Sequence, residues 1–210
     1  MQTGSHNFLF AWLLKQQAKK LIRLAVDGNV LDVGSGTKPY LDEMLKQAES
    51  VTHVDLKPGA DIQADFTKWR GTQVYDTITA FQVLEHVTDP DLFMLNASIH
   101  LENRGKMIVT VPFMWREHEE PLDFHRWTRY GLAELANKHG FEVRLLEPST
   151  GFWLAIALQI NYYLLRLPLA RFWLAPFFVM HQIVAYGLDL LDVKYRHRYT
   201  AGWSMILEKR

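Results

Sequence analysis

The chain has 210 residues, with 23 basic and 23 acidic side chains and no cysteine. This length fits one domain with a sizeable hydrophobic core. The lack of cysteine excludes disulfides, cysteine-ligated zinc and thiol nucleophiles, and it suits a reducing compartment such as the cytoplasm. Balanced charge argues against bare nucleic acid as the main partner, because phosphate binding requires a basic surplus.

The order of the predicted elements indicates an α/β protein. Short apolar runs bounded by turn residues predict strands, which cover residues 29–33, 51–55, 61–64, 76–81, 105–112, 141–147 and 201–209. Apolar periodicity and turn residues predict the helices, which cover residues 7–26, about 39–49, a segment after Pro90, and 128–139. This alternation is typical of a doubly wound, mostly parallel sheet with helices on both faces.

The first predicted strand ends in the segment LDVGSGTKPY, residues 31–40. Ligands of a doubly wound sheet bind at the carboxyl ends of its strands, so this turn is the first candidate site. A dinucleotide site requires a third glycine where this chain has proline, and a phosphate loop requires a G-K-[ST] sequence that is absent. What remains is the acid Asp32 and the turn Gly34-Ser35-Gly36. Glycines allow close approach of a ligand, and an aspartate suits an ammonium group, which together favour S-adenosylmethionine.

Two further acids follow the next strands. Asp55 ends the second strand, where a carboxylate can accept both hydroxyl hydrogens of a ribose. Asp65 follows the third strand, where it can accept a hydrogen bond from an adenine amino group while Phe66 or Phe81 packs on the ring. A single aspartate at a strand end is more often a helix cap or turn residue. The order and spacing of the three acids favour a nucleoside site.

The segments LDVGSGTKPY, VTHVD, ADFT, DTITAFQVLEHVTDP and GKMIVTVPF resemble class I S-adenosylmethionine-dependent methyltransferases of the type that acts on small molecules. The resemblance covers residues 28–147 and resumes at the last strand. It implies a seven-stranded Rossmann-like sheet whose antiparallel last strand lies beside the fifth. It also implies that Gly34 and Gly36 approach the methionine part of the cofactor. The other implied contacts are Asp55 at the ribose, Asp65 near adenine, and Phe81 and Gln82 at the methionine end. Leu56 and Phe66 are also expected among the cofactor-binding residues.

A polar segment, PFMWREHEEPLDFHRWTRYGL, follows the fifth strand immediately. It is similar to a signature of methyltransferases found among bacterial surface-glycan biosynthesis genes. If the acceptor is a hydroxyl, a nearby base helps by removing its proton. We expect His118 to be this base, with Asp123 and Arg126 as orienting or substrate-binding groups. The alternatives are a solvated histidine and an Asp123–Arg126 ion pair that only braces the loop.

No metal site is expected in the same segment. The H-E-x-x-H spacing is missing, and Pro121 would break a helix that presented two ligands on one face. Glu85 and His86, which follow the fourth strand, are interpreted as structural residues that border the cofactor.

Residues 151–199 form a long apolar insertion before the last strand. Its uncharged runs, 152–165 and 172–188, are each shorter than the roughly twenty residues of a membrane span, so we expect no spanning helix. Three interpretations remain open: a lid over the acceptor pocket, a peripheral contact of 151–198 with a membrane surface, or the face of a homodimer.

We expect one methyltransferase domain over residues 1–210, composed of an N-terminal helix (7–26), a cofactor-binding core (28–147), the insertion (151–199) and the last strand (201–209). The expected reaction is O-methylation of a small or lipid-linked acceptor by S-adenosylmethionine, in the cytoplasm or at the inner face of the membrane, with no nucleic-acid substrate. The alternatives are a nicotinamide-dependent oxidoreductase and a non-catalytic S-adenosylmethionine-binding module. No signal peptide is expected, because basic residues follow the first apolar stretch and do not precede it.

Overall fold

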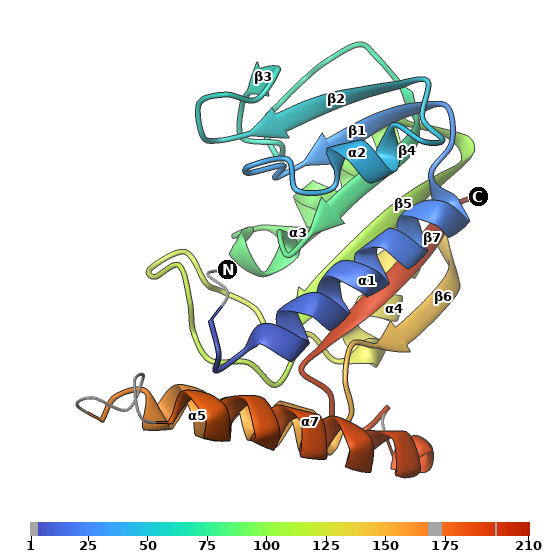
Figure 1. The fold of residues 1–210 in the computed structure, drawn as a ribbon. Coiled ribbons are helices and arrows are strands. Elements are labelled where there is room, and N and C mark those ends of the chain that lie inside the picture. Colours follow the sequence, from blue (N-terminus) through green and yellow to red (C-terminus); the bar gives the residue numbers. More distant parts are fainter. Residues whose placement is uncertain (1–3, 168–173, 196) are drawn as a thin grey trace.

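The computed structural model describes residues 4–167, 174–195 and 197–210, and these form a sheet covered by helices on both faces (Figure 1). The strands are β1 (Asn29–Val33), β2 (Ser50–Asp55), β3 (Ile62–Gln63), β4 (Tyr75–Phe81), β5 (Leu101–Pro112), β6 (Phe141–Pro148) and β7 (Gly202–Lys209). They form one seven-stranded sheet in the order β3-β2-β1-β4-β5-β7-β6. Only β7 runs antiparallel to its neighbours, between β5 and β6, which confirms the predicted fold class.

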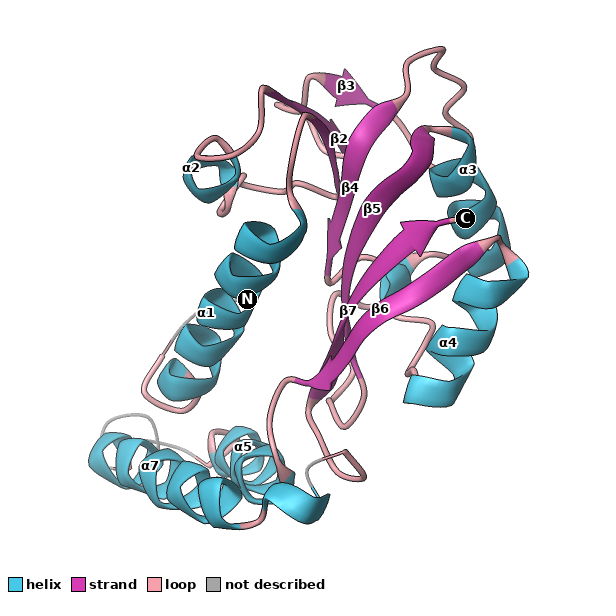
Figure 2. Cartoon of the chain, turned by 90° about the vertical axis from the view of Figure 1, so that its right-hand side faces the viewer, coloured by secondary structure: helices cyan, strands magenta, loops and turns pink. Residues whose placement is uncertain are grey.

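The described helices are α1 (Phe8–Ala25), α2 (Leu41–Met44), α3 (Pro90–Ile99), α4 (Arg129–Lys138), α5 (Phe152–Leu164) and α7 (Ala175–Leu191), with 3-10 turns η1 (Leu84–His86) and η2 (Val193–Tyr195). Figure 2 shows α1 and α2 on one face of the sheet and α3 and α4 on the other. The helix expected over 39–49 is much shorter. Its chain continues as turns, and the backbone N–H of Glu49 then donates to Gly28 O at 2.7 Å, which leads directly into β2.

The core consists of two apolar layers, one on each face of the sheet. On one face, Leu21 and Ile22 of α1 pack against Val30 and Ile108. On the other face, Phe93 of α3 and Leu132 of α4 belong to the larger cluster. Because both faces are covered, the central strands are mostly apolar, and buried polar side chains such as Asp32 and Thr79 hydrogen-bond to each other within the sheet.

The described part of the insertion, residues 151–167, 174–195 and 197–199, forms a separate layer beyond the sheet, and the other residues predicted for it lie outside the described ranges. Helices α5 and α7 lie beyond the end of the sheet toward which the arrows of β4 and β5 point (Figure 1). The two ends of the insertion are held together at its base. The backbone N–H of Thr150 donates to Thr200 Oγ1 at 3.1 Å, and that of Ala201 donates to Thr150 Oγ1 at 2.9 Å. Among the residues described, no helix has both the length and the apolar character needed to cross a membrane.

Candidate functional site

The glycine turn after β1 has a backbone that requires its glycines. Gly34 has φ +69° and Gly36 has φ +52°, in the left-handed region that side chains disfavour. A Cβ atom on Gly34 would lie 2.5 Å from Val83 Cγ2, whereas one on Gly36 would meet nothing within 4 Å. The turn therefore packs closely on the segment after β4 while Gly36 stays open on its outer side. Ser35 between them is buried, and its Oγ has no hydrogen-bond partner among the described residues.

Asp55 at the end of β2 is joined directly to this turn. Its Oδ2 accepts the backbone N–H of Gly36 at 2.8 Å, and its Oδ1 accepts that of Lys57 at 2.8 Å. Each carboxylate oxygen has a further lone pair, so two hydroxyl groups can still bind there. Leu56 follows with 66% of its surface exposed. The structure thus brings together the glycines and the ribose acid that the sequence predicts.

Asp32 lies under the turn, and its carboxylate is engaged within the sheet. Oδ1 accepts the Thr79 hydroxyl at 2.7 Å, and Oδ2 lies 3.3 Å from His53 Nδ1. Asp32 therefore links β1 to β4 and β2. Its direct contact with a ligand ammonium stays a prediction.

The residues expected at the two ends of the cofactor lie on either side of the turn. Gln82 has φ +56°, and its backbone N–H donates to Thr110 O at 2.9 Å, which places it just past β4. The Phe81 ring packs on Tyr40, with 4.7 Å between ring centroids. These positions are compatible with the predicted contacts at the methionine end.

Asp65 and Phe66 have local partners on the adenine side. Asp65 Oδ1 accepts both the backbone N–H and the hydroxyl of Thr67, at 3.0 and 2.7 Å, and Oδ2 lies 3.2 Å from Lys68 Nζ. The Phe66 ring is 5% exposed and packs edge-on against Phe93 in the core. Both side chains therefore have structural roles here, and their contacts with adenine stay predictions.

The acceptor loop, residues 113–128, is organised around Asp123. Both guanidinium NH2 groups of Arg126 donate to the Asp123 carboxylate at 2.6 Å, and this pairing holds the pKa of Asp123 well below its usual range. Arg126 also donates to the backbone carbonyls of Trp115 and Arg116, which closes the loop on itself. The backbone N–H of His118 donates to Asp123 Oδ2 at 2.9 Å. The three residues predicted to act on the acceptor therefore form one connected group.

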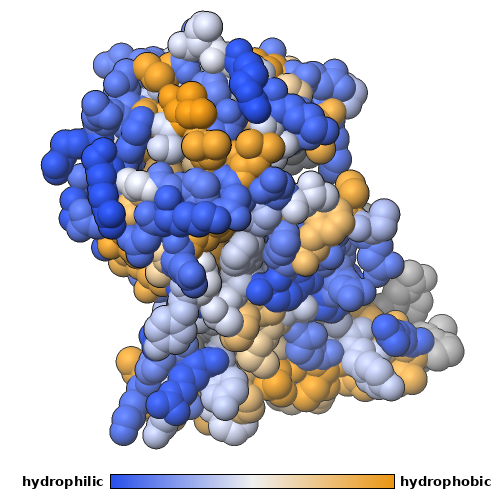
Figure 3. All heavy atoms as spheres, turned by 180° about the vertical axis from the view of Figure 1, so that it is seen from behind, coloured by the Kyte–Doolittle hydropathy of each residue, from blue (hydrophilic) through white to orange (hydrophobic). Residues whose placement is uncertain are grey.

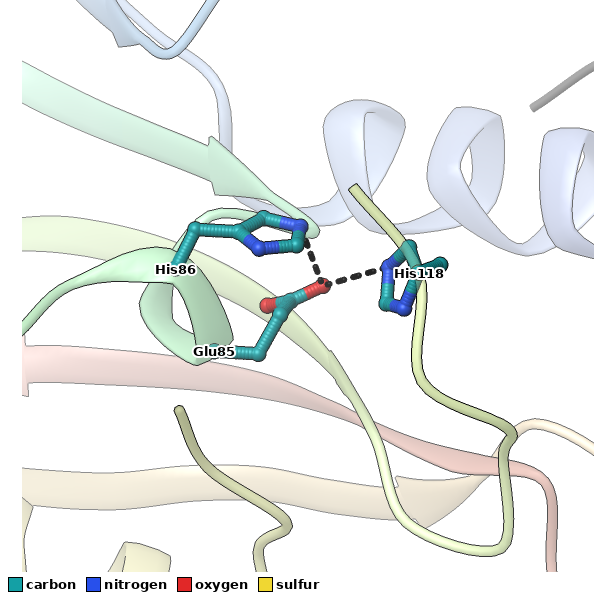
Figure 4. Close-up of side chains that lie close together, drawn as sticks. All are labelled: Glu85, His86 and His118. Carbon is teal, nitrogen blue, oxygen red and sulfur yellow. Dashed lines mark ion pairs between the residues drawn. The ribbon is translucent and has the colours of Figure 1, made fainter. Parts of the chain in front are cut away.

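The structure adds two residues to this group that the sequence interpretation left as structural. Glu85 of η1 is completely buried, and its Oε1 lies 3.9 Å from His86 Nε2 and 4.0 Å from His118 Nε2 (Figure 4). Burial raises the pKa of Glu85 to about 8. Burial also lowers the pKa of His118, which favours a neutral imidazole that can accept a proton. In the sequence, these two residues could have been recognised as site candidates from the position of Leu84-Glu85-His86 just after β4, because ligands of such sheets bind at the carboxyl ends of the strands.

A family model described as a methyltransferase domain matches residues 6–146, more than half of the 210 residues. The chain belongs to this methyltransferase-domain family. This confirms the predicted class I S-adenosylmethionine-dependent methyltransferase, with S-adenosylmethionine as its methyl donor. No curated protein matches the chain in sequence.

Several solved structures have the same fold as this methyltransferase. An S-adenosylmethionine-dependent methyltransferase from Clostridium acetobutylicum is 9% identical with a TM-score of 0.59, and the match covers 93% of this chain and 89% of the other. The 1,6-didemethyltoxoflavin-N1-methyltransferase of Burkholderia thailandensis, solved with S-adenosylhomocysteine, is 15% identical with a TM-score of 0.59, covering 93% and 78%. The [4+2]-cyclase SpnF is 16% identical with a TM-score of 0.59, covering 92% and 81%. Such a fold therefore does not determine the acceptor chemistry.

The chain's own residues fit the methyl donor of this methyltransferase. The turn has an open outer side at Gly36, an unpartnered buried hydroxyl at Ser35, and a carboxylate at Asp55 with free lone pairs. S-adenosylmethionine, when bound, supplies a methyl group that its sulfonium already activates. The protein's task is to orient the acceptor and exclude water.

The insertion of this methyltransferase braces the acceptor loop. Gln159 of α5 donates from Nε2 to Met114 O at 2.9 Å, and the Arg116 guanidinium lies 4.7 Å from the Tyr162 ring centroid. Trp115 also stacks on Phe10 of α1, with 4.7 Å between ring centroids. These contacts lie just before His118, so the insertion holds the start of the loop that carries it.

Two surface hollows of the methyltransferase lie away from the glycine turn and His118, and the second contacts both ends of the acceptor loop, at Phe113 and Thr128. One, of about 540 Å³, lies between α1 and the end of β6, and the other, of about 350 Å³, lies beside the start of α4. Neither is lined by the glycine turn or by His118. The candidate site is therefore defined by the positions and chemistry of its side chains, and neither of these two hollows contains it.

Proposed function

We propose that this methyltransferase transfers a methyl group to a hydroxyl of an amphiphilic, lipid-linked acceptor, such as a sugar on a lipid carrier. The observation that carries the acceptor class is the exposed apolar face of α7, a helix that buries the polar side chains of Gln182 and Asp189. The glycine turn with Asp55 supports the cofactor half of the proposal, and the Asp123-centred loop supports the acceptor half.

The cofactor half is tested by calorimetric titration. We expect S-adenosylmethionine and S-adenosylhomocysteine to bind and NAD to bind far more weakly. Asp55→Ala should weaken cofactor binding by about 1–3 kcal/mol, because charge-assisted hydrogen bonds to the ribose are lost. Tighter binding of NAD than of either S-adenosyl compound would favour the oxidoreductase alternative and overturn the assignment.

We propose His118 as the base that removes the hydroxyl proton. Its imidazole is kept neutral by burial, and Asp123, fixed by Arg126, lies 3.1 Å from its Nδ1, where it can stabilise the imidazolium that forms. His118→Ala should lower turnover by about 10²–10⁴-fold, the range for one general base, while calorimetry shows unchanged cofactor binding. Unchanged turnover in this variant would remove His118 from the mechanism.

Helix α7 buries two polar side chains, Gln182 and Asp189, beside the apolar Phe178 and Ala185, and most of its exposed side chains are apolar. Gln182 and Asp189 are 0% and 1% exposed, and each bonds to backbone groups of neighbouring segments. The exposed apolar side chains of the helix are Phe177, Met180, Ile183, Val184, Leu188, Leu190 and Leu191. Figure 3 shows apolar atoms gathered over the insertion at the lower edge of the molecule. The solvent-facing side of a surface helix is normally polar, so an exposed apolar face of this kind marks a surface that binds a partner or a membrane.

The occupant we propose for this face is an anionic membrane surface. Three basic residues lie near the helices of the insertion in the sequence: Arg166 follows α5, and Lys194 and Arg198 follow α7. Each lies over a tyrosine ring. Tyrosine and basic side chains around an apolar face suit the boundary between headgroups and acyl chains. A membrane-bound enzyme of this kind meets acceptors whose lipid part is already in the bilayer.

The membrane proposal is tested by sedimentation with vesicles. The full chain should sediment with vesicles of phosphatidylglycerol and phosphatidylcholine, and less with phosphatidylcholine alone. A triple variant, Met180→Ser, Val184→Ser and Leu191→Ser, should stay in the supernatant. The matched control replaces exposed apolar residues elsewhere: Leu24→Ser, Leu45→Ser and Ile99→Ser. The proposal would be contradicted if the wild-type chain sedimented with neither vesicle type. It would also be contradicted if analytical ultracentrifugation showed a stable dimer that the triple variant abolishes.

A further inference from the structure

We propose that Glu85, His86 and His118 form a binding site for a divalent transition-metal ion, with Zn²⁺ as the best-fitting ion. One potential ligand atom from each residue lies within 4.8 Å of the others. His86 comes from η1 and His118 from the acceptor loop, and they approach the Glu85 carboxylate from different sides (Figure 4). Both histidines turn Nε2 toward the same oxygen, Glu85 Oε1.

The outer nitrogens of both imidazoles have partners that orient them. His86 Nδ1 lies 2.6 Å from Leu122 O, and since a carbonyl only accepts, the proton is on Nδ1 and the lone pair on Nε2. His118 Nδ1 lies 3.1 Å from Asp123 Oδ2, near enough to favour a proton on this nitrogen although it is not aligned as a hydrogen bond. Outer partners of this kind typically orient metal-ligating histidines.

The burial of the Glu85 carboxylate is a second observation that points to a bound cation. The Glu85 side chain is 0% exposed, and no other residue in the described part of the chain donates a hydrogen bond to either carboxylate oxygen. A buried carboxylate without compensation is unfavourable. The neighbouring Asp123 adds negative charge to the same region, although Arg126 neutralises it. A metal ion bound between the carboxylate and the two imidazoles would supply the missing partner.

The donor set selects the kind of ion. Two imidazole nitrogens and one carboxylate oxygen suit Zn²⁺ and related transition metals. Mg²⁺ and Ca²⁺ prefer sites made of oxygen atoms, so they should bind weakly here. Three protein ligands also leave a fourth position open for water or another small group.

The site has a consequence that rests on the proposed function. A bound ion takes the Nε2 lone pair of His118, which the proposed base needs for the hydroxyl proton. Zn²⁺ should therefore inhibit methyl transfer without displacing the cofactor, and chelation should restore activity.

Metal binding is measured on the full chain after treatment with a chelator. Zn²⁺ is titrated in competition with a chromophoric chelator, and Co²⁺ binding is followed by visible absorption. We expect one tight equivalent, which Mg²⁺ does not displace. Glu85→Gln and His86→Ala should each weaken Zn²⁺ binding by at least about tenfold, and Asp123→Asn by about 10–100-fold through loss of the outer partner.

The matched control is His139→Ala, because His139 also pairs with a carboxylate, Asp91, at 2.7 Å, but lies outside the cluster. This variant should bind Zn²⁺ as the wild type does. Thermal unfolding provides a second readout, since a ligand that binds only the folded state raises Tm. Zn²⁺ should raise the Tm of the wild type and of His139→Ala, but not of Glu85→Gln.

Two results would overturn the site: no tight equivalent in the wild type, or unchanged Zn²⁺ affinity in both Glu85→Gln and His86→Ala. The metal-free samples are also titrated with S-adenosylhomocysteine. Cofactor binding without zinc binding would reject the metal site and leave the methyltransferase assignment intact. Zinc binding together with unchanged turnover in His118→Ala would support the metal site and reject His118 as the base.

Discussion

Gly34 and Gly36 share a backbone conformation but differ in their surroundings. Left-handed φ values cost an alanine about 1–2 kcal/mol at either position. Only at Gly34 does the added Cβ also meet Val83, at 2.5 Å. We therefore predict a larger loss in the free energy of unfolding for Gly34→Ala than for Gly36→Ala, measured by urea denaturation. Equal losses would mean that the contact with Val83 is relieved without cost.

Glu43 makes stability depend on pH at the acid end. Its carboxylate accepts hydrogen bonds from Lys46 Nζ and Arg23 Nε, both at 2.7 Å, and these lower its pKa from 4.5 to about 2. Its contribution is therefore present above about pH 4.5 and is lost as the pH falls toward 2. The difference in urea midpoint between wild type and Glu43→Gln should be clear at pH 7 and should shrink below pH 4. A difference that stays constant over this range would contradict the prediction.

At the scale of elements, Asp189 joins α7 to the start of α5. Its carboxylate accepts the backbone N–H groups of Gly151 at 2.9 Å, Trp153 at 2.9 Å and Leu154 at 3.2 Å. The first N–H groups of a helix have no partner within the helix, and an acid there also interacts favourably with the helix dipole. This explains a buried aspartate in a helix whose exposed face is apolar.

Asp189→Ala should lower the free energy of unfolding by about 1–3 kcal/mol, because buried N–H groups lose their acceptor. Asp189→Asn keeps one acceptor oxygen and should lose less. Circular dichroism during thermal unfolding compares the two variants. An alanine variant as stable as the asparagine variant would show that other groups or water satisfy these donors.

At the scale of the whole molecule, the insertion and the sheet have separate apolar cores. The insertion packs on α1 through a small cluster that includes Phe10, Leu154 and Leu158, while the sheet is covered on both faces. Regions with fewer buried contacts open at lower free energy. We predict that amides of α7 exchange with deuterium faster than those of β4 and β5, as mass spectrometry can measure. Simultaneous exchange of both regions would indicate one cooperative unit.

Local signals in the sequence determined the order of strands and helices and the first half of the candidate site. Buried parallel strands are continuous apolar runs, and left-handed turns select glycine, so both can be recognised without knowledge of distant residues. The turn Gly34-Ser35-Gly36 and the acid Asp55 were predicted from such local signals. The 2.8 Å hydrogen bond from the Gly36 N–H to the Asp55 carboxylate follows from the adjacent positions of β1 and β2.

The tertiary structure alone decided which distant side chains meet and which way α7 faces. Glu85 and His86 follow β4, and His118 follows β5; they converge because these strands are neighbours in the sheet. The sequence left open whether the apolar insertion is a lid, a membrane contact or a dimer face. In the structure, Gln182 and Asp189 of α7 bond inward, to the backbone of residues 5–9 and to the start of α5, while apolar side chains such as Leu191 are exposed. Such pairings depend on contacts across the chain, because a buried polar group is stable only where a partner from another segment satisfies it.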